Sequence, residues 1–142
     1  AGLFSRRCFK IDSLAVGETD DPLVSCMTIV SSGDQRTIEQ IEKQLNKKLD
    51  VIKVKTFEEN SSISRELLLM KVKYNKSNRR DIMEICEIMH AQIVDMSKSM
   101  MLIQMCDIPE RIQLLISMFK TVSIVEVART GTLALQKCGE TD

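Results

Sequence analysis

Aromatic residues are scarce in this chain, and their scarcity argues against one class of function. The 142 residues include four Phe, one Tyr and no Trp. Sheets that bind single-stranded RNA stack bases on aromatic side chains of their central strands. No aromatic octamer of that kind occurs here, and Phe119 falls on an apolar helical stripe that explains it. We therefore expect no nucleic-acid partner.

The chain also lacks an excess of either charge and any long apolar run. Twenty Lys and Arg balance twenty Asp and Glu, so no global field attracts nucleic acid or an anionic membrane. No apolar run approaches the roughly 18 residues that span a bilayer, which predicts no membrane partner. At 44% hydrophobic, the chain has enough apolar surface for one domain or two small ones.

Histidine is nearly absent, and the cysteines are widely spaced. With His90 as the only histidine and no CxxC pair, the sequence predicts no metal site. The five cysteines are more consistent with a reduced intracellular protein that buries its thiols, and the nine methionines with core packing. The cysteines are Cys8, Cys26, Cys86, Cys106 and Cys138.

Candidate catalytic groups are missing as well. No nucleophile stands beside an activating base in any recognisable pattern, so we expect no catalytic residue. His90 is expected at a helix end or on the surface. Asp20 and Asp21 precede Pro22 as in a tight turn rather than a metal site. Residues 129–131 are expected to end a strand in a turn, with a role at a subunit contact as the alternative.

Hydrophobic spacing divides the first half of the chain into strand, strand, helix and strand. Apolar residues alternate over 11–16 and 27–30, with a polar turn between them at 17–22. Apolar residues at helical spacing follow over 38–45, and 51–57 is expected to be a short strand.

The second half shows the same scheme with an additional strand and helix at its start. The expected elements are a strand at 68–74, a helix at 82–89 capped by Asn78, strands at 93–96 and 100–105, a helix from Pro109 to Phe119, and a strand at 122–127. This βαββαβ order is the ferredoxin-like unit, in which two helices cover one face of an antiparallel sheet.

Comparison of the halves predicts an α+β protein with two ferredoxin-like (βαββαβ) units. The first half begins with a helix end at residues 2–4, so it matches the second without its first strand and most of its first helix. We expect a fragment of a longer chain, with a truncated domain at 1–57, a linker at 58–64 and a second domain at 65–142.

Several short motifs in fixed order carry a family resemblance that spans nearly the whole chain. They are Gly2-Leu3-Phe4-Ser5-Arg6-Arg7, Thr19-Asp20-Asp21-Pro22, Glu39-Gln40-Ile41-Glu42-Lys43-Gln44-Leu45 and Glu126-Val127-Ala128-Arg129-Thr130-Gly131. In this order they resemble the small regulatory subunit of acetolactate synthase (acetohydroxyacid synthase). The resemblance implies that the first domain is an ACT domain.

The resemblance further implies a non-catalytic regulatory subunit in valine, leucine and isoleucine biosynthesis. Such a subunit activates the large catalytic subunit and mediates feedback inhibition by valine, which binds where two ACT domains of a homodimer meet. Thiamine diphosphate, magnesium and FAD are expected on the large subunit, with no cofactor in this chain. The implied compartment is the bacterial cytoplasm or the plastid stroma. The alternative is an ACT-domain amino-acid sensor that regulates another enzyme.

Lys10 and Ile11 occupy the positions that correspond to part of the effector site in this family. The family has an Asn-Ile pair there, whereas this chain has Lys10. Lysine donates three hydrogen bonds and carries a positive charge, which suits a carboxylate and repels an ammonium. Valine inhibition is therefore expected to be weak, unless Lys10 points into solvent and the site tolerates it.

Overall fold

The computed structural model describes residues 13–31, 35–47, 56 and 58–139. Backbone contacts group the chain into two units. One comprises Ala1–Ile63 with Ala134–Asp142, and the other comprises Ser64–Leu133. The chain therefore passes between the units twice, once near residue 63 and once near residue 133.

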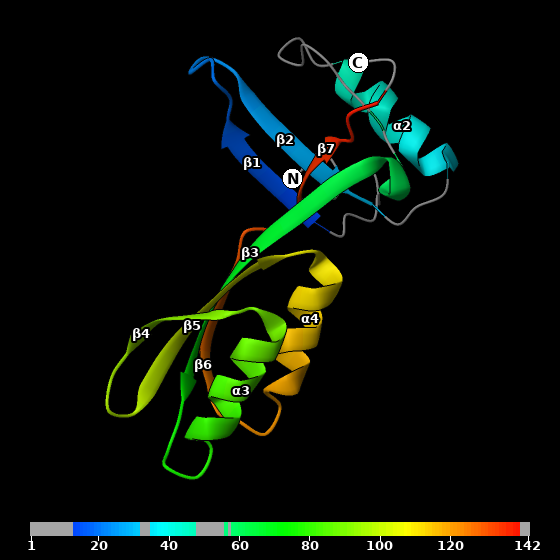
Figure 1. Ribbon diagram of the computed structural model, residues 1–142. Coiled ribbons are helices and arrows are strands. Elements are labelled where there is room, and N and C mark those ends of the chain that lie inside the picture. The colour runs from blue at the N-terminus through cyan, green and yellow to red at the C-terminus, as the bar shows by residue number, and fades with distance from the viewer. Residues whose placement is uncertain (1–12, 32–34, 48–55, 57, 140–142) are drawn as a thin grey trace. The chain divides into compact units, whose positions relative to one another are not determined.

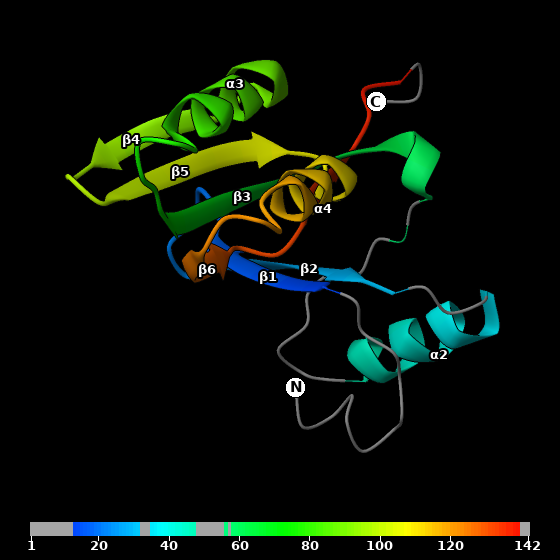
Figure 2. The same cartoon turned by 90° about the horizontal axis from the view of Figure 1, so that it is seen from below.

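The first unit contains an antiparallel hairpin and a helix. Strands β1 (Ser13–Glu18) and β2 (Ser25–Val30) pair in register, and α2 (Gln35–Asn46) follows them. Figure 2 shows the two strands in blue and the helix in cyan. Ala15 on β1 and Ile41 on α2 are the buried apolar residues among those described in this unit. These elements match the expected strands, turn and helix to within a few residues.

Two expected features of the first unit lie almost entirely outside the described residues. They are the helix end at residues 2–4 and the strand at 51–57. Within the latter only Thr56 is described, and it belongs to no strand or helix.

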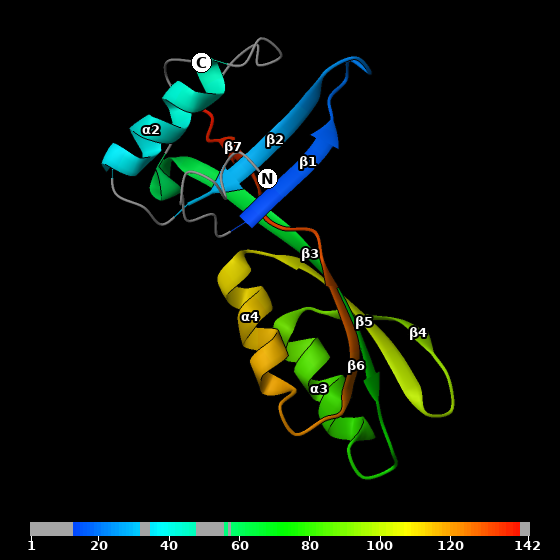
Figure 3. The ribbon, with the colours of Figure 1, turned by 180° about the vertical axis from the view of Figure 1, so that it is seen from behind.

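The second unit is an antiparallel sheet with two helices (Figure 1). After α2 the elements follow in the order η1 (Glu59–Ser61, a short 3₁₀ turn), β3 (Ser62–Lys73), α3 (Arg79–Met89), β4 (Gln92–Met96), β5 (Met100–Asp107), α4 (Pro109–Met118), β6 (Ile124–Arg129) and β7 (Leu133–Gln136). The second unit holds those from β3 to β6, while η1, the first two residues of β3 and most of β7 are grouped with the first unit. The strand order is β4-β5-β3-β6, and β7 also pairs with β3. Figure 3 shows α3 and α4 side by side. The βαββαβ order from β3 to β6 confirms the predicted fold.

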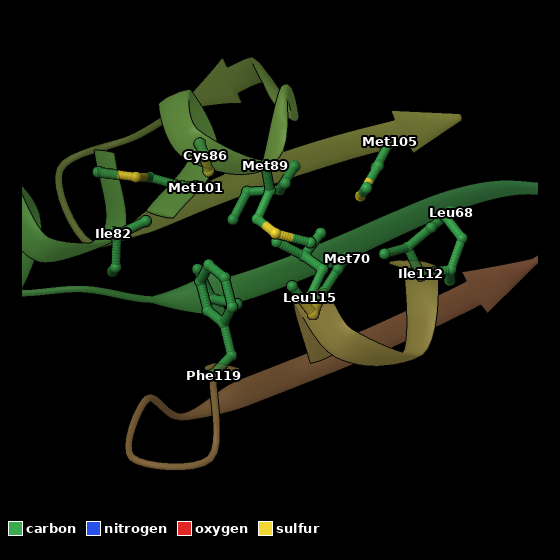
Figure 4. Packing of buried hydrophobic residues seen from close by; sticks show 12 residues of the cluster. Leu68, Met70, Ile82, Cys86, Met89, Met101, Met105, Ile112, Leu115 and Phe119 are labelled. Atoms are coloured by element: carbon green, nitrogen blue, oxygen red, sulfur yellow. The ribbon is translucent and has the colours of Figure 1, made fainter. Parts of the chain in front are cut away.

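The core lies between this sheet and its helices because apolar residues follow the period of each element. Along β3 every second residue from Glu66 to Val72 is buried, as expected for a strand covered on one face. Figure 4 shows side chains from β3, β5, α3 and α4 converging on one another. The fully buried members include Leu68, Met70, Ile82, Met101, Ile103, Ile112, Leu115 and Phe119.

Two element boundaries and one additional strand differ from the sequence prediction. The segment expected to be structureless, 58–64, holds η1 and the start of β3. Strand β7 was not predicted. It pairs with β3, and one residue beyond the two strands the Lys137 N–H donates to the Ser61 carbonyl at 2.8 Å. The last expected strand, 122–127, is shifted to Ile124–Arg129, because the Val122 N–H instead donates to Phe119 in a turn.

Candidate functional site

The two predicted effector-binding residues lie outside the described residues. Lys10 and Ile11 precede β1, whose first residue is Ser13. Their assignment therefore stays a prediction.

The Asp20-Asp21-Pro22 segment forms the hairpin turn, as predicted. The Thr19 hydroxyl donates to the Asp21 and Val24 carbonyls, and the Asp21 carboxylate accepts the Leu23 N–H at 3.0 Å. The Asp21 carboxylate, which could have suggested a metal site, thus helps to close the turn between β1 and β2.

Arg129 forms the most buried ionic contact in the described part of the chain. Its guanidinium donates to both carboxylate oxygens of Glu66, at 2.6 and 3.2 Å, and to the side-chain oxygen of Gln113 at 3.1 Å. The Glu66 side chain is only 4% exposed, whereas that of Arg129 is 35% exposed. The pair links β3 to β6 across 63 residues of sequence, and Gln113 adds helix α4.

Thr130 and Gly131 complete the same segment. The Thr130 N–H donates to the Leu67 carbonyl, and the Thr130 hydroxyl oxygen accepts the Leu67 N–H at 3.0 Å. The side chain thus continues the β3–β6 pairing by one residue where the backbone turns away. Gly131 has a φ of 82°, a conformation that disfavours other residues. Each residue of the Arg-Thr-Gly segment therefore has a role inside this unit, and the predicted strand end is confirmed.

A second ion pair lies where β5 leads into α4. Arg111 donates to Asp107 at 2.9 Å, and its guanidinium also donates to the Met89 carbonyl at the end of α3. Burial alone would raise the pKa of Asp107. Hydrogen bonds from the Ile108 backbone and Arg111, with the positive charges of Arg111 and Arg65, outweigh it and hold that pKa below its usual value. The i,i+4 spacing of Asp107 and Arg111 could have revealed this pair from the sequence.

The two residues expected at the ends of α3 behave differently from each other. His90 is exposed and ends the helix in the left-handed conformation, with a φ of 60°, which confirms its expected position. Asn78 occupies the N-cap, but its side chain makes no capping bond to the helix. Its side-chain oxygen accepts the Asn75 N–H at 2.8 Å instead. Asn78 therefore has the predicted position, but the prediction that its side chain caps the helix is wrong.

The expectation of buried thiols holds for only one described cysteine. Cys86 is buried, and desolvation raises its pKa to about 11. Cys26, Cys106 and Cys138 are exposed. The prediction failed because spacing along the sequence does not reveal which face of a strand is covered.

The methionines divide in the same way. Four of them, Met70, Met89, Met101 and Met105, are buried in the core, but Met27, Met83, Met96 and Met118 are exposed. The expectation that most serve as core residues is therefore wrong for the exposed group.

The described residues offer no arrangement suited to acid–base or metal chemistry. Glu66 is the only charged side chain that is buried among them, and Arg129 occupies both of its oxygens. The same residues contain no cluster of three potential metal ligands. None of their helices is both long and apolar enough to cross a bilayer.

Comparison with known proteins matches both parts of the chain. Residues 1–53 match the AHAS small subunit-like ACT domain, and residues 65–138 match the family described as the small subunit of acetolactate synthase. The chain belongs to the acetolactate synthase small-subunit family. Its first part is therefore an ACT domain, and its biosynthetic context is that of the branched-chain amino acids.

Individual relatives agree along nearly the whole length. The chain is 39% identical over 142 residues to a probable acetolactate synthase small subunit of Methanothermobacter thermautotrophicus, covering 99% of this chain and 84% of the relative. It is 37% identical over 137 residues to the isozyme 3 small subunit of Escherichia coli, covering 96% and 84%. The crystal structure of the Thermotoga maritima small subunit superposes with a TM-score of 0.90 at 33% identity, covering 97% of this chain and 86% of that one.

Proposed function

We propose that this chain is a regulatory subunit of acetolactate synthase that binds the large catalytic subunit and raises its activity. The observation that carries the proposal is the tandem order of the two matches, an ACT domain followed by the C-terminal domain of the same family. A free-standing amino-acid sensor would need an ACT domain, but it would not need the second domain of the synthase small-subunit family.

The chemistry of the described residues supports a non-catalytic role. Condensation of two pyruvates needs a group that stabilises a carbanion, and the protein around it must supply proton transfer. Glu66 is committed to Arg129, and Asp107 is committed to Arg111 and the Ile108 backbone. We therefore assign thiamine diphosphate, magnesium and FAD to the large subunit and the response to effectors to this chain.

Activity measurements with the cognate large subunit test this assignment. The full-length small subunit should form no acetolactate from pyruvate by itself and should raise the turnover of the large subunit in proportion to complex formation. Acetolactate formed by the small subunit alone, after contaminating large subunit has been excluded, would refute the non-catalytic role. A large subunit that binds the chain without any change in rate would refute activation.

We further propose that valine binds at the contact of two ACT domains in a homodimer, and that Lys10 weakens its binding. The exposed apolar residues of the hairpin, Leu14, Val16 and Met27, supply surface of the kind such a contact covers. If Lys10 lies beside the valine ammonium at ~4 Å, the repulsion costs about 1 to 4 kcal/mol. That corresponds to a loss in affinity of about 5-fold to several hundred-fold.

Calorimetric titration with valine tests the role of Lys10. Lys10→Asn in the full-length protein should bind valine at least several-fold more tightly than the unmodified protein. Lys76→Asn, which removes an exposed lysine in the second unit, is the matched control and should leave the affinity unchanged. Equal affinity of the unmodified protein and the Lys10→Asn variant would show that the lysine does not face the ammonium. In that case activation of the large subunit could still hold.

A further inference from the structure

Three connections of the second unit meet at one end of its sheet. They are the β3–α3 loop (74–78), the β4–β5 turn (97–99) and the α4–β6 loop (119–123). Backbone hydrogen bonds join them, since the Tyr74 N–H donates to the Ser99 carbonyl and the Lys73 N–H to the Ser123 carbonyl, both at 2.9 Å. Figure 1 shows the β3–α3 and α4–β6 loops together at the lower end of this unit.

The side chains around these three connections are mostly cationic. Six exposed Lys and Arg residues lie on them or next to them, and none of the six forms an ion pair with another described residue. We call this cluster the basic end. It consists of Lys73, Lys76, Arg79, Arg80, Lys98 and Lys120. Asp81 and Glu84 on α3 and Asp95 on β4 offset part of this charge and leave it positive.

The basic end is a local feature rather than a consequence of composition. The chain as a whole has a formal net charge of zero. At the opposite end of the same sheet, Arg129 pairs with Glu66 and Arg111 pairs with Asp107. The second unit therefore satisfies cations with its own carboxylates at one end and leaves them exposed to solvent at the other.

Two of the cations lie where a helix disfavours them. Arg79 and Arg80 are the first two residues of α3, and the N-terminus of a helix carries a partial positive charge that repels cations. The Asn78 side chain makes no capping bond there to offset this effect. Folding therefore gives no reason to place arginines at these positions, whereas binding to a negatively charged partner does.

The composition of the basic end fits a protein partner better than a nucleic acid. Proteins that bind single-stranded nucleic acids stack bases on aromatic side chains. Here Phe119 is fully buried, and the half-buried Tyr74 donates its hydroxyl to the Ser97 carbonyl. Met83 and Met96, which flank the cations, are 46% and 43% exposed. Exposed methionines beside charged residues are typical of protein–protein interfaces.

We propose that the basic end binds an acidic surface of the large catalytic subunit. The inference rests on the proposed function, which requires this chain to bind that subunit. Because the six cations are exposed, they act mainly on the rate of association, by attracting a negatively charged surface over a distance of ~8 Å at physiological salt.

Association kinetics of the full-length protein with its cognate large subunit test the proposal. Arg80→Glu on α3 and Lys98→Glu on the β4–β5 turn should each lower the association rate constant about three-fold or more at low salt, because charge reversal replaces attraction by repulsion. Both effects should shrink as sodium chloride is added. Arg80→Glu also places an acid at the start of α3, which favours the helix, so slower binding by this variant does not reflect loss of folding.

A matched charge reversal shows whether position matters. Lys137→Glu replaces an exposed lysine outside the basic end, changes the net charge equally, and should leave the association rate constant unchanged. Equal effects of all three substitutions would overturn the proposal, because net charge alone would then explain them. Association of Arg80→Glu and Lys98→Glu at the unmodified rate would overturn it too, even if the basic end bound a nucleic acid. Absence of any binding by the unmodified chain would refute the proposed function as well.

Carbodiimide cross-linking identifies the chemistry of the contacted surface. This reagent adds no spacer and joins an amine only to a carboxylate that touches it. In the complex, Lys76 or Lys98 should be joined to Asp or Glu residues of the large subunit. Cross-links to the large subunit that involve only lysines outside the basic end would overturn the proposal.

Discussion

Removal of Arg129 should destabilise the second unit much more than removal of its partner Glu66. The difference follows from burial. Glu66 is 4% exposed and Arg129 is 35% exposed. Without Arg129, the carboxylate stays in a dry site and loses both of its hydrogen bonds. Without Glu66, the guanidinium can turn toward water and keep its contact with Gln113.

The expected magnitudes follow from measured classes of ion pair. Leaving a buried charge without its partner costs about 3 to 5 kcal/mol, and partial exposure of Arg129 lowers this to about 2 to 3 kcal/mol for Arg129→Met. Glu66→Met should cost about 1 kcal/mol or less, because methionine fills the volume and leaves no buried charge. The double variant should be more stable than Arg129→Met alone.

Urea unfolding of all four proteins measures the cycle. The chain has one tyrosine and no tryptophan, so Tyr74 fluorescence reports on the second unit alone, and far-ultraviolet circular dichroism follows the whole chain. Lys71→Met removes the exposed Lys71–Glu126 pair and is the matched control, with an expected change below about 0.5 kcal/mol. Equal losses for Arg129→Met and Glu66→Met, or a coupling energy near zero, would refute the burial argument.

Two further predictions concern the ends of the helices. Asp107→Asn keeps the oxygen that accepts the Ile108 N–H but removes the charge paired with Arg111. Because the folded pKa of Asp107 is lowered, the pair stabilises the protein above the ordinary aspartate pKa of about 3.9, and this contribution disappears as pH falls through the lower folded pKa. The free energies of unfolding in urea should therefore differ by up to about 1 kcal/mol at pH 7 and converge in strong acid, and a difference independent of pH would contradict the charge argument. His90→Gly should stabilise the protein by about 0.5 kcal/mol, since glycine adopts the left-handed conformation at this position without strain. The greater conformational entropy of glycine in the unfolded chain offsets part of this stabilisation. His90→Val should destabilise it in the same urea assay, and a loss of stability with glycine would show that the imidazole makes a contact of its own.

Much of the fold could be predicted because it rests on local patterns. Alternation along β3 and the apolar stripes of α3 and α4 identify covered faces without knowledge of any partner strand. The hairpin turn was predictable for the same reason, since Thr19 and Asp21 bond to their immediate neighbours. Of the candidate site, the sequence indicated the Arg-Thr-Gly segment but not the partners of its side chains.

The features that sequence reasoning missed depend on residues far apart in the chain. Strand β7 has few residues and weak alternation, and it exists because the early part of β3 offers it a pairing edge. The exposure of Cys106 likewise follows from its opposition to Leu67 on a face that no helix covers. Neither fact can be predicted from the spacing of apolar residues within a single helix or strand.

Motif order and hydrophobic spacing were sufficient to predict the family, the order of the elements and the apolar core residues of the second unit. Periodicity and motif order are properties of neighbouring residues, so they can be read before folding. Three features could be seen only in the folded chain: the ion pair of Arg129 with an acidic residue 63 positions away, the residue at which β3 begins, and the leucines of β3 that remain exposed. These depend on the choice of strand partners, which is set by the total free energy of packing and pairing rather than by any short segment.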